Sequence, residues 1–260
     1  MACALITGAS GGLGWEIARV FAERGYDLVL VARREDKLAQ LADELSQAYG
    51  VVVRYVAADL ATPEGLVALT NLTDSLTAEG RTIDVLVNNA GFGDCADFAE
   101  ADIHKLDRMI ELNIRALTDL TYYYLGPMLD RGAGRILNVA SVGAFEPGPG
   151  MATYYASKAY VLSLTDALAE ELRGTGVTAT ALCPGTTDTG FWEAADAGEL
   201  SRARQAAIAN PAEVAAYGYE SLMAGRVVAV PGLGNKIMVT AARLCPRPLL
   251  RRVMRMLLAK

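Results

Sequence analysis

Short apolar segments of strand-forming composition alternate along this chain with longer amphipathic segments, and this alternation limits the folds that it can adopt. The short segments have the length of strands and cover residues 2–7, 28–32, 51–57, 85–88, 135–141, 177–183 and 227–230. The amphipathic segments carry apolar residues at helical spacing and cover residues 13–24, 35–48, 64–78, 103–131 and 154–173. When a helix connects two neighbouring strands of one sheet, the second strand runs parallel to the first. The pattern therefore predicts a parallel sheet.

The composition of the strands predicts how that sheet is covered. Residues 28–32 read Leu-Val-Leu-Val-Ala and are apolar on both faces, which is typical of a strand between two layers of helices. No internal repeat or low-complexity linker divides the chain of 260 residues, and a single domain of this size is common for α/β proteins. We predict an α/β fold with a doubly wound parallel sheet of seven strands over residues 1–235, followed by a separate C-terminal extension.

Charge and composition exclude several function classes. The net charge of −6 and the pI near 5.0 argue against nucleic-acid binding, because phosphates require a basic surface. One histidine and four scattered cysteines include no CxxC pair, so we expect neither a metal site nor a disulfide framework. Polar residues interrupt every apolar stretch before it reaches about 18 residues, so we expect no transmembrane helix. We see no targeting signal and expect a cytoplasmic protein.

A glycine-rich turn joins the first predicted strand to the first predicted helix. Gly8, Gly12 and Gly14 follow the spacing Gly-x-x-x-Gly-x-Gly, and Leu13 already belongs to the helical pattern. A backbone that turns tightly against a pyrophosphate leaves no room for Cβ atoms, and the helix that follows offers free N–H groups to the anion. The turn predicts a dinucleotide phosphate site, with a purely structural glycine turn as the alternative.

Two arginines follow the second predicted strand. NAD-binding folds often place an acid there against the adenosine ribose, whereas NADP-binding folds place a cation against its 2′-phosphate. Here the residues are Arg33 and Arg34. The guanidinium of Arg33 can bind a phosphate through two parallel hydrogen bonds, with Ser10 or Arg34 as helpers. The alternative is a solvated pair of arginines at a helix start.

Polar residues also follow the third and fourth predicted strands. Asp59 and Leu60 follow the third strand, and the sequence Asn88-Asn89-Ala90-Gly91 follows the fourth. Binding sites in doubly wound sheets lie beyond the carboxyl ends of the strands. We therefore expect these groups to converge with the glycine turn.

Tyr154 and Lys158 are spaced i, i+4 in a predicted helix, so both side chains can contact one ligand. An adjacent ammonium stabilises a phenolate and lowers the pKa of the phenol, which would make Tyr154 a proton donor and acceptor. Ser141 ends the fifth predicted strand and can bind the same carbonyl oxygen. Asn113 interrupts an apolar helix, and a water chain toward Lys158 would give its buried amide a partner.

These motifs are weak singly, but in their order along nearly the whole chain they resemble the short-chain dehydrogenase/reductase family. The resemblance rests on residues 7–14, 88–91, Asn113, Ser141, Tyr154 with Lys158, and Pro184-Gly185. It implies a Rossmann fold in which Tyr154 is the general acid/base and Ser141 positions the substrate oxygen. Lys158 would hold the nicotinamide-ribose hydroxyls and lower the pKa of the tyrosine, and Asn113 would maintain a proton-relay water.

The resemblance also implies which residues contact the cofactor. Asn88 would support the fourth strand and the ribose, Asp59 would face the adenine, and Pro184-Gly185 with Thr187 or Thr189 would line the nicotinamide. The implied set is Gly8, Ser10, Gly12, Leu13, Gly14, Arg33, Arg34, Asp59, Leu60, Asn88, Ala90, Gly91, Tyr154, Lys158, Pro184, Gly185, Thr187 and Thr189.

By this resemblance, the chain is expected to be an NADP(H)-dependent oxidoreductase that moves a hydride between nicotinamide C4 and a carbonyl carbon. Arg33 favours NADP(H) over NAD(H), although Gly11 stands where many NADP-preferring relatives have a basic residue. Phe145, Met151, Phe191 and Trp192 indicate an apolar substrate pocket. A non-catalytic NADP(H)-binding sensor or scaffold is the alternative function. A homodimer or homotetramer is expected from the resemblance, through the helix that carries the tyrosines at 122–124.

The C-terminal extension, residues 236–260, differs in charge from the rest of the chain. It holds seven basic residues and no acidic one, which leaves a charge of −13 on the remainder. Leu249, Leu250, Val253, Met254 and Leu257 have helical spacing beside its arginines and predict an amphipathic helix. We favour a helix packed over the substrate pocket or against a neighbouring subunit. The second hypothesis is peripheral contact with an anionic membrane.

Overall fold

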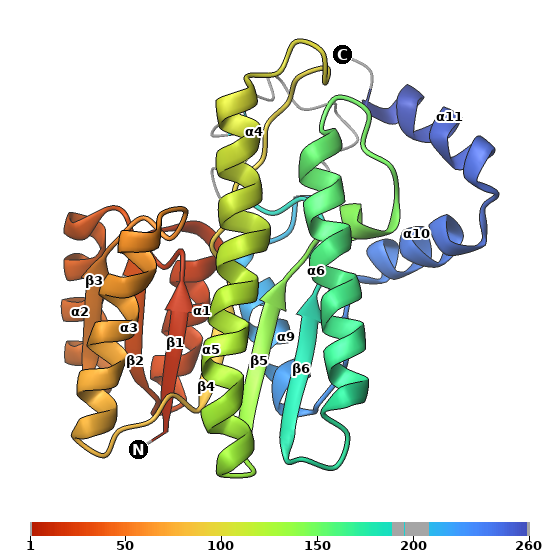
Figure 1. The fold of residues 1–260 in the computed structure, drawn as a ribbon. Helices are drawn as coiled ribbons and strands as arrows, with labels where there is room; N and C mark the ends of the chain where they lie inside the picture. The colour runs from red at the N-terminus through yellow and green to blue at the C-terminus, as the bar shows by residue number, and fades with distance from the viewer. Residues whose placement is uncertain (1, 189–194, 196–207, 259–260) are drawn as a thin grey trace.

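A seven-stranded parallel sheet forms the centre of the protein (Figure 1). The computed structural model describes residues 2–188, 195 and 208–258. Neighbouring strands pair in the order β3-β2-β1-β4-β5-β6-β7, all parallel. They are β1 (Cys3–Thr7), β2 (Asp27–Ala32), β3 (Val53–Ala57), β4 (Val85–Asn88), β5 (Gly134–Val139), β6 (Val177–Leu182) and β7 (Val228–Ala229). The predicted doubly wound sheet is confirmed.

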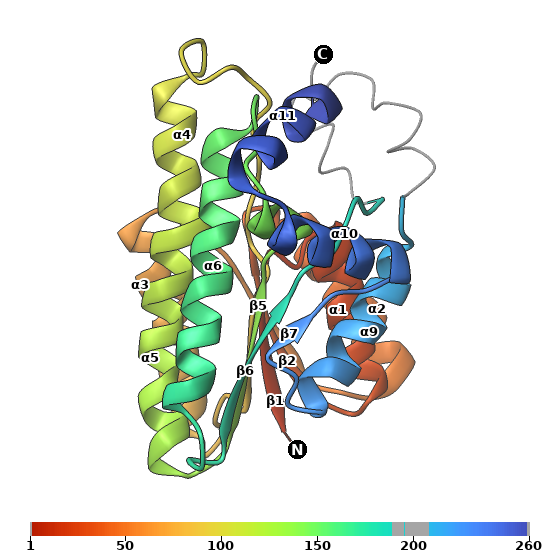
Figure 2. The same cartoon turned by 90° about the vertical axis from the view of Figure 1, so that its right-hand side faces the viewer.

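Helices cover both faces of the sheet (Figure 2). One layer contains α1 (Gly12–Glu23), α2 (Glu35–Tyr49) and α9 (Pro211–Met223), and the other contains α3 (Pro63–Ala78), α5 (Leu117–Asp130) and α6 (Ala152–Glu171). Phe21 and Leu41 are buried in the core under the first layer, and Leu69 and Tyr124 in the core under the second. Burial of apolar side chains on both faces explains why the central strands are continuously apolar.

The order of the sheet reverses between β1 and β4, which are neighbours although two strands separate them in sequence. The connection after β1 and the connection after β4 run to opposite faces of the sheet. A crevice therefore opens between them at the carboxyl ends of these two strands. The Thr7 hydroxyl ties the two strands together here, because it accepts hydrogen bonds of 2.9 Å from the backbone N–H groups of Asn89 and Ala90. We therefore expect the functional site at this point of the sheet, between the ends of β1 and β4.

Residues 103–131, which we predicted as one helix, form three consecutive helical segments. They are α4 (Ile103–Ile110), a π-helical segment (Glu111–Ala116) and α5. A π-turn inserts an extra residue into the helix and shifts the side chains beside it. Asn113 lies in this wider turn and is buried.

Two helices that lie outside both layers end the described chain, α10 (Leu233–Leu244) and α11 (Arg247–Leu258). They extend as a V beyond the edge of the sheet (Figure 1). The break between them coincides with Cys245 and Pro246, since a proline in a helix interior removes a backbone donor and clashes with the preceding turn. In the part of the chain that the structure describes, no helix has the length and hydropathy needed to cross a membrane.

Candidate active site

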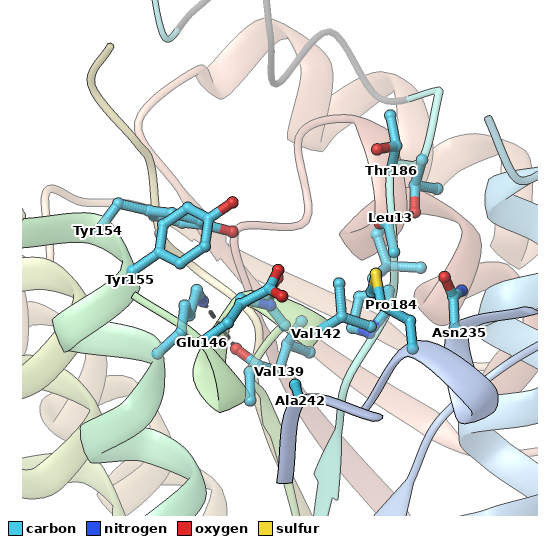
Figure 3. Close-up of a pocket in the computed structure, with 18 of the residues that line it drawn as sticks. Leu13, Val139, Val142, Glu146, Tyr154, Tyr155, Pro184, Thr186, Asn235 and Ala242 are labelled. Atoms are coloured by element: carbon cyan, nitrogen blue, oxygen red, sulfur yellow. Dashed lines mark hydrogen bonds between the residues drawn. The ribbon is translucent and has the colours of Figure 1, made fainter. Parts of the chain in front are cut away.

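A cavity of about 690 Å³ lies at the carboxyl ends of the central strands, between the glycine turn and the C-terminal helices. Figure 3 shows Tyr154 and Glu146 on one side of it and Leu13 and Pro184 on the other. The predicted site residues that line it are Gly8, Gly12, Leu13, Gly14, Ala90, Gly91, Ser141, Tyr154, Lys158, Pro184, Gly185 and Thr187. The site is therefore assembled from segments that are distant in the sequence.

The glycine turn has the conformation and the close approaches that exclude side chains. Gly8 and Gly12 have positive φ angles of 68° and 55°, a region that most residues avoid. A Cβ on Gly14 would lie 2.3 Å from the Gly8 carbonyl oxygen. Helix α1 begins at Gly12 without a side-chain cap, so its first N–H groups are available to an anion. The turn fits the pyrophosphate of a dinucleotide.

The side chains of Arg33 and Arg34, which follow β2, have different surroundings. Arg34 folds back onto the turn, where its Nη2 donates a 2.7 Å hydrogen bond to the Ser10 carbonyl oxygen and a 3.2 Å bond to Ser10 Oγ. A Cβ on Gly11 would lie 2.9 Å from this Nη2, so the guanidinium occupies the space that a side chain at position 11 would take. Arg33 is exposed at the end of β2. The turn thus carries a cation in spite of Gly11.

The structure does not place Asp59, Leu60, Asn88 or Thr189, four predicted cofactor contacts, in the wall of the cavity. Asp59 and Leu60 lie outside the residues that line the cavity. Partial burial raises the pKa of Asp59, but a 2.7 Å hydrogen bond from Arg108 and one from the Ala61 N–H bring it below its ordinary value. Thr189, like Phe191 and Trp192, lies outside the described residues.

Asn88, the fourth of these residues, supports the strands rather than the cavity. Its Nδ2 donates hydrogen bonds of 3.0 Å to Thr121 Oγ1 and 2.9 Å to Asn138 Oδ1, and all three residues are buried. The next residue, Asn89, lines the cavity and donates from Nδ2 to the Thr7 carbonyl oxygen at 2.8 Å. Asn88 therefore ends the strand among buried partners, and Asn89, the first residue after it, faces the site.

Ser141 and Tyr154 meet at one side of the cavity. Ser141 Oγ accepts a 3.0 Å hydrogen bond from the Gly143 N–H, and a side-chain hydrogen bond with Tyr154 lowers the pKa of the phenol. Burial of Tyr154 outweighs that bond, so the pKa lies above its ordinary value. The phenol is therefore protonated at neutral pH and can donate its hydrogen.

The ammonium of Lys158 contacts the backbone and the ring rather than the phenol oxygen. Its Nζ donates a 2.7 Å hydrogen bond to the Val139 carbonyl oxygen and lies 5.9 Å from the centre of the Tyr154 ring. Burial lowers the pKa of Lys158 to about 8. In this structure burial of the phenol dominates its pKa and the ammonium is held at the strand end, so the lowering of the Tyr154 pKa by Lys158 stays a prediction.

Asn113 is fully engaged by protein groups. Its Nδ2 donates to the Phe92 carbonyl oxygen at 2.9 Å and to Ser157 Oγ at 3.1 Å, and its Oδ1 accepts from the Phe92 N–H at 3.1 Å. A Cβ on Gly91 would lie 2.9 Å from Asn113 Oδ1 and 3.5 Å from Lys158 Nζ. Asn113 thus fixes the loop after β4 close to the ammonium, while its relay water stays a prediction.

The outer wall of the cavity comes from the C-terminal extension. Met238, Ala242, Cys245, Leu250, Val253, Met254, Leu257 and Leu258 line it. Leu250 and Met254 of α11 are buried against Met151 and Tyr155. Arg243 lies over the Phe145 ring, 4.8 Å from its centre, and so fixes α10 against the loop after β5. The helical spacing in residues 249–258 predicted this helix, and packing over the pocket was one of the two positions that we favoured for it.

The cavity brings together a site for an anionic dinucleotide and two hydroxyl groups that face the same space. The described residues contain no cluster of three or more histidine, cysteine or acidic side chains that could hold a metal ion. The donors in the cavity include the Tyr154 phenol, the Ser141 hydroxyl and the Lys158 ammonium, and these groups suit proton transfer to an oxygen.

A family model described as short chain dehydrogenase matches residues 2–200. The chain is 39% identical over 189 residues to sulfoacetaldehyde reductase 2 of Chromohalobacter salexigens, covering 72% of this chain and 73% of that one. A short-chain dehydrogenase from Sphingobium yanoikuyae in complex with NADPH is 33% identical, with a TM-score of 0.80 over 94% of both chains. A short-chain dehydrogenase/reductase from Burkholderia phymatum in complex with NAD is 28% identical, with a TM-score of 0.80 over 92% of both.

Proposed function

Because the chain belongs to the short chain dehydrogenase family, we propose that it is an NADP(H)-dependent oxidoreductase that reduces a carbonyl group to an alcohol or runs the reverse reaction. The observation that carries the proposal is the meeting of Ser141 and Tyr154 in a cavity that also contains the glycine turn and Lys158. A hydroxyl pair beside a dinucleotide site suits hydride transfer coupled to proton transfer.

The residues of the site have separate tasks in this proposal. When bound, NADP(H) supplies or accepts the hydride at nicotinamide C4. Ser141 and Tyr154 donate hydrogen bonds to the carbonyl oxygen, and these bonds strengthen as negative charge develops on it. Tyr154 then passes its proton to that oxygen, and the phenol carries this proton beforehand because its pKa lies above its ordinary value. Lys158 holds the ribose hydroxyls, and Pro184, Gly185 and Thr187 line the nicotinamide.

The preference for NADP(H) is supported by the charge around the glycine turn. Arg33 is exposed at the end of β2, and Arg34 contacts Ser10 at the turn. Two guanidinium groups provide donors for a 2′-phosphate, and no acid stands at the position that often binds the ribose hydroxyl in NAD-dependent folds. Among the similar structures, one holds NADPH and another holds NAD, so the coenzyme must be tested directly.

The substrate in this proposal is an apolar carbonyl compound. Leu250, Val253, Met254 and Leu258 form one side of the cavity, and an apolar wall binds by excluding water from a hydrocarbon surface. Phe145 packs beside it under Arg243. Larger ketones and aldehydes should therefore bind more tightly than small polar ones.

The assay that tests the function is a panel of aliphatic, aromatic and polar carbonyl compounds, each with NADPH and with NADH. We expect oxidation of NADPH with the apolar compounds, and nearly abolished activity in the Tyr154→Phe variant. If the purified protein binds NADPH but oxidises it with none of the compounds, the non-catalytic sensor is the better description.

The proposal also includes a homodimer or homotetramer in the cytoplasm. Tyr122 and Leu129 are 85% and 40% exposed on α5, and Ile103 is 60% exposed at the start of α4. Exposed apolar side chains on one surface are typical of subunit contacts. The four cysteines are free thiols, which fits a reducing compartment.

A further inference from the structure

The outer surface of α10 carries an apolar stripe. Leu233, Ile237 and Leu244 are 75%, 63% and 80% exposed, and their spacing of four and seven residues places them on one side of the helix. Val239 and Ala242 of the same helix are buried. Helix α10 is therefore apolar on both its inner and its outer side.

Helix α11 divides its apolar residues in a similar way. Leu250 and Met254 are buried against the body, whereas Leu249, Met256 and Leu257 are between 53% and 72% exposed. Only the inner residues are needed to attach the helix. The described body leaves more than half of the surface of each exposed residue uncovered, so packing within the chain does not account for their apolar character.

The same two helices carry cations without acids. Lys236, Arg243, Arg247, Arg251, Arg252 and Arg255 are exposed, and none of them forms an ion pair with an acid among the described residues. The chain contains no Asp or Glu after Glu220. A strongly basic surface thus stands on a protein whose remaining residues are acidic.

We propose that this surface docks the protein peripherally on an anionic lipid surface. The docking face comprises Leu233, Ile237, Leu244, Leu249, Met256 and Leu257 with the six exposed cations of 236–255. The partner must offer hydrocarbon beneath a layer of negative charge, and an anionic bilayer has this arrangement. The cations attract the headgroups, and the apolar residues enter the boundary between headgroups and acyl chains.

The docking face adjoins the cavity. Leu257 belongs to the docking face and also lines the cavity. If the proposed function holds, a lipid-soluble carbonyl compound can pass from the bilayer into the site without crossing water. The docking itself does not depend on catalysis, because it uses only the surface of α10 and α11.

The test is sedimentation of the full-length protein with vesicles, without cofactor or substrate. One vesicle preparation is pure phosphatidylcholine, and the other contains equal parts of phosphatidylcholine and phosphatidylglycerol. The apolar variant combines Leu233→Ser, Ile237→Ser and Leu244→Ser, and the charge variant combines Arg251→Gln, Arg252→Gln and Arg255→Gln. Controls replace Val67 and Val227 by Ser, or Arg54, Arg173 and Arg226 by Gln, at exposed positions outside α10 and α11.

We expect the wild type and both controls to sediment with the anionic vesicles only, and each docking-face variant to lose at least about tenfold in partitioning. Binding should weaken with salt. The proposal is overturned if the wild type stays in the supernatant, or if the controls lose binding equally. It is also overturned if the apolar variant dissociates an oligomer in lipid-free sedimentation velocity, because the face would then join two copies of this chain.

Discussion

The Nζ atom of Lys158 donates a 2.7 Å hydrogen bond to the carbonyl oxygen of Val139, the last residue of β5. This bond holds the ammonium at the carboxyl end of the sheet, where the chain turns into Ser141. It joins helix α6 to the strand that leads to the site.

The buried ammonium should make stability rise with pH. The pKa of Lys158 is lowered from 10.5 to about 8 by burial, so the unfolded chain binds more protons than the folded one between these values. The destabilisation is fully present below pH 8 and is relieved as the pH rises toward 10.5. Relative to Lys158→Met, the wild type should gain up to about 3 kcal/mol across this window. Urea unfolding without cofactor at several pH values measures the gain, and Lys37→Met, at a half-buried lysine of α2, should reproduce the wild-type curve.

The phenol of Tyr154 should be essential to turnover and dispensable for cofactor binding. Tyr154→Phe removes the proton donor and should lower kcat by about a thousandfold. The NADPH Kd, measured by fluorescence titration, should change less than about threefold, because the ring remains. The control is Tyr160→Phe on the same helix, whose hydroxyl contacts Thr118 at 3.0 Å outside the cavity. If the Tyr154→Phe variant turned over substrate at the wild-type rate, Tyr154 would not be the proton donor.

The arginines should discriminate between the coenzymes. Arg33→Ala and Arg34→Ala should each raise the Kd for NADPH by about tenfold or more and leave the Kd for NADH nearly unchanged. Arg34→Ala also releases Ser10 from its 2.7 Å hydrogen bond. Arg24→Ala, at an exposed arginine at the end of α1, is the matched control. Equal losses for both coenzymes would assign the arginines to the shared part of the dinucleotide.

Two helical glycines should respond oppositely to the same substitution. Gly14→Ala drives a Cβ into the Gly8 carbonyl oxygen at 2.3 Å and should cost about 2 kcal/mol or more of stability together with cofactor binding. A Cβ on Gly126, within α5, meets nothing within 4 Å, so Gly126→Ala should stabilise by about 1 kcal/mol. The free energy of unfolding of both variants is measured by urea denaturation. If Gly14→Ala stabilised the protein as Gly126→Ala does, the close approach at position 14 would not exclude a side chain.

The wall formed by α11 should limit substrate size. Val253 lines the cavity, and Val253→Trp should raise KM for bulky ketones by about tenfold while small ones change little. Leu249→Trp places the same ring on the exposed side of α11 and should leave both KM values unchanged in vesicle-free assays. An equal effect on small and bulky ketones would place Val253 outside the path of the substrate.

The sequence was sufficient for the sheet because alternation and two-sided apolar strands are local properties. Residues 28–32 indicate their burial by composition, and the glycine spacing at 8–14 indicates a turn without side chains whatever the rest of the chain does. The segment 103–131 shows the limit. Its helical period is correct, but the structure has a π-turn around Asn113, and the partners that Asn113 binds there, Phe92 and Ser157, lie far away in sequence.

Other features depended on the tertiary structure for the same reason. The charge state of Tyr154 is set by burial, which a spacing of four residues to Lys158 does not reveal. The cation above Gly11 comes from Arg34, a residue of the next connection. The wall of the cavity comes from residues near the C-terminus. Local composition determined the elements and the chemistry that they carry, whereas distances, burial and the partners of each charge arose only when remote segments packed together.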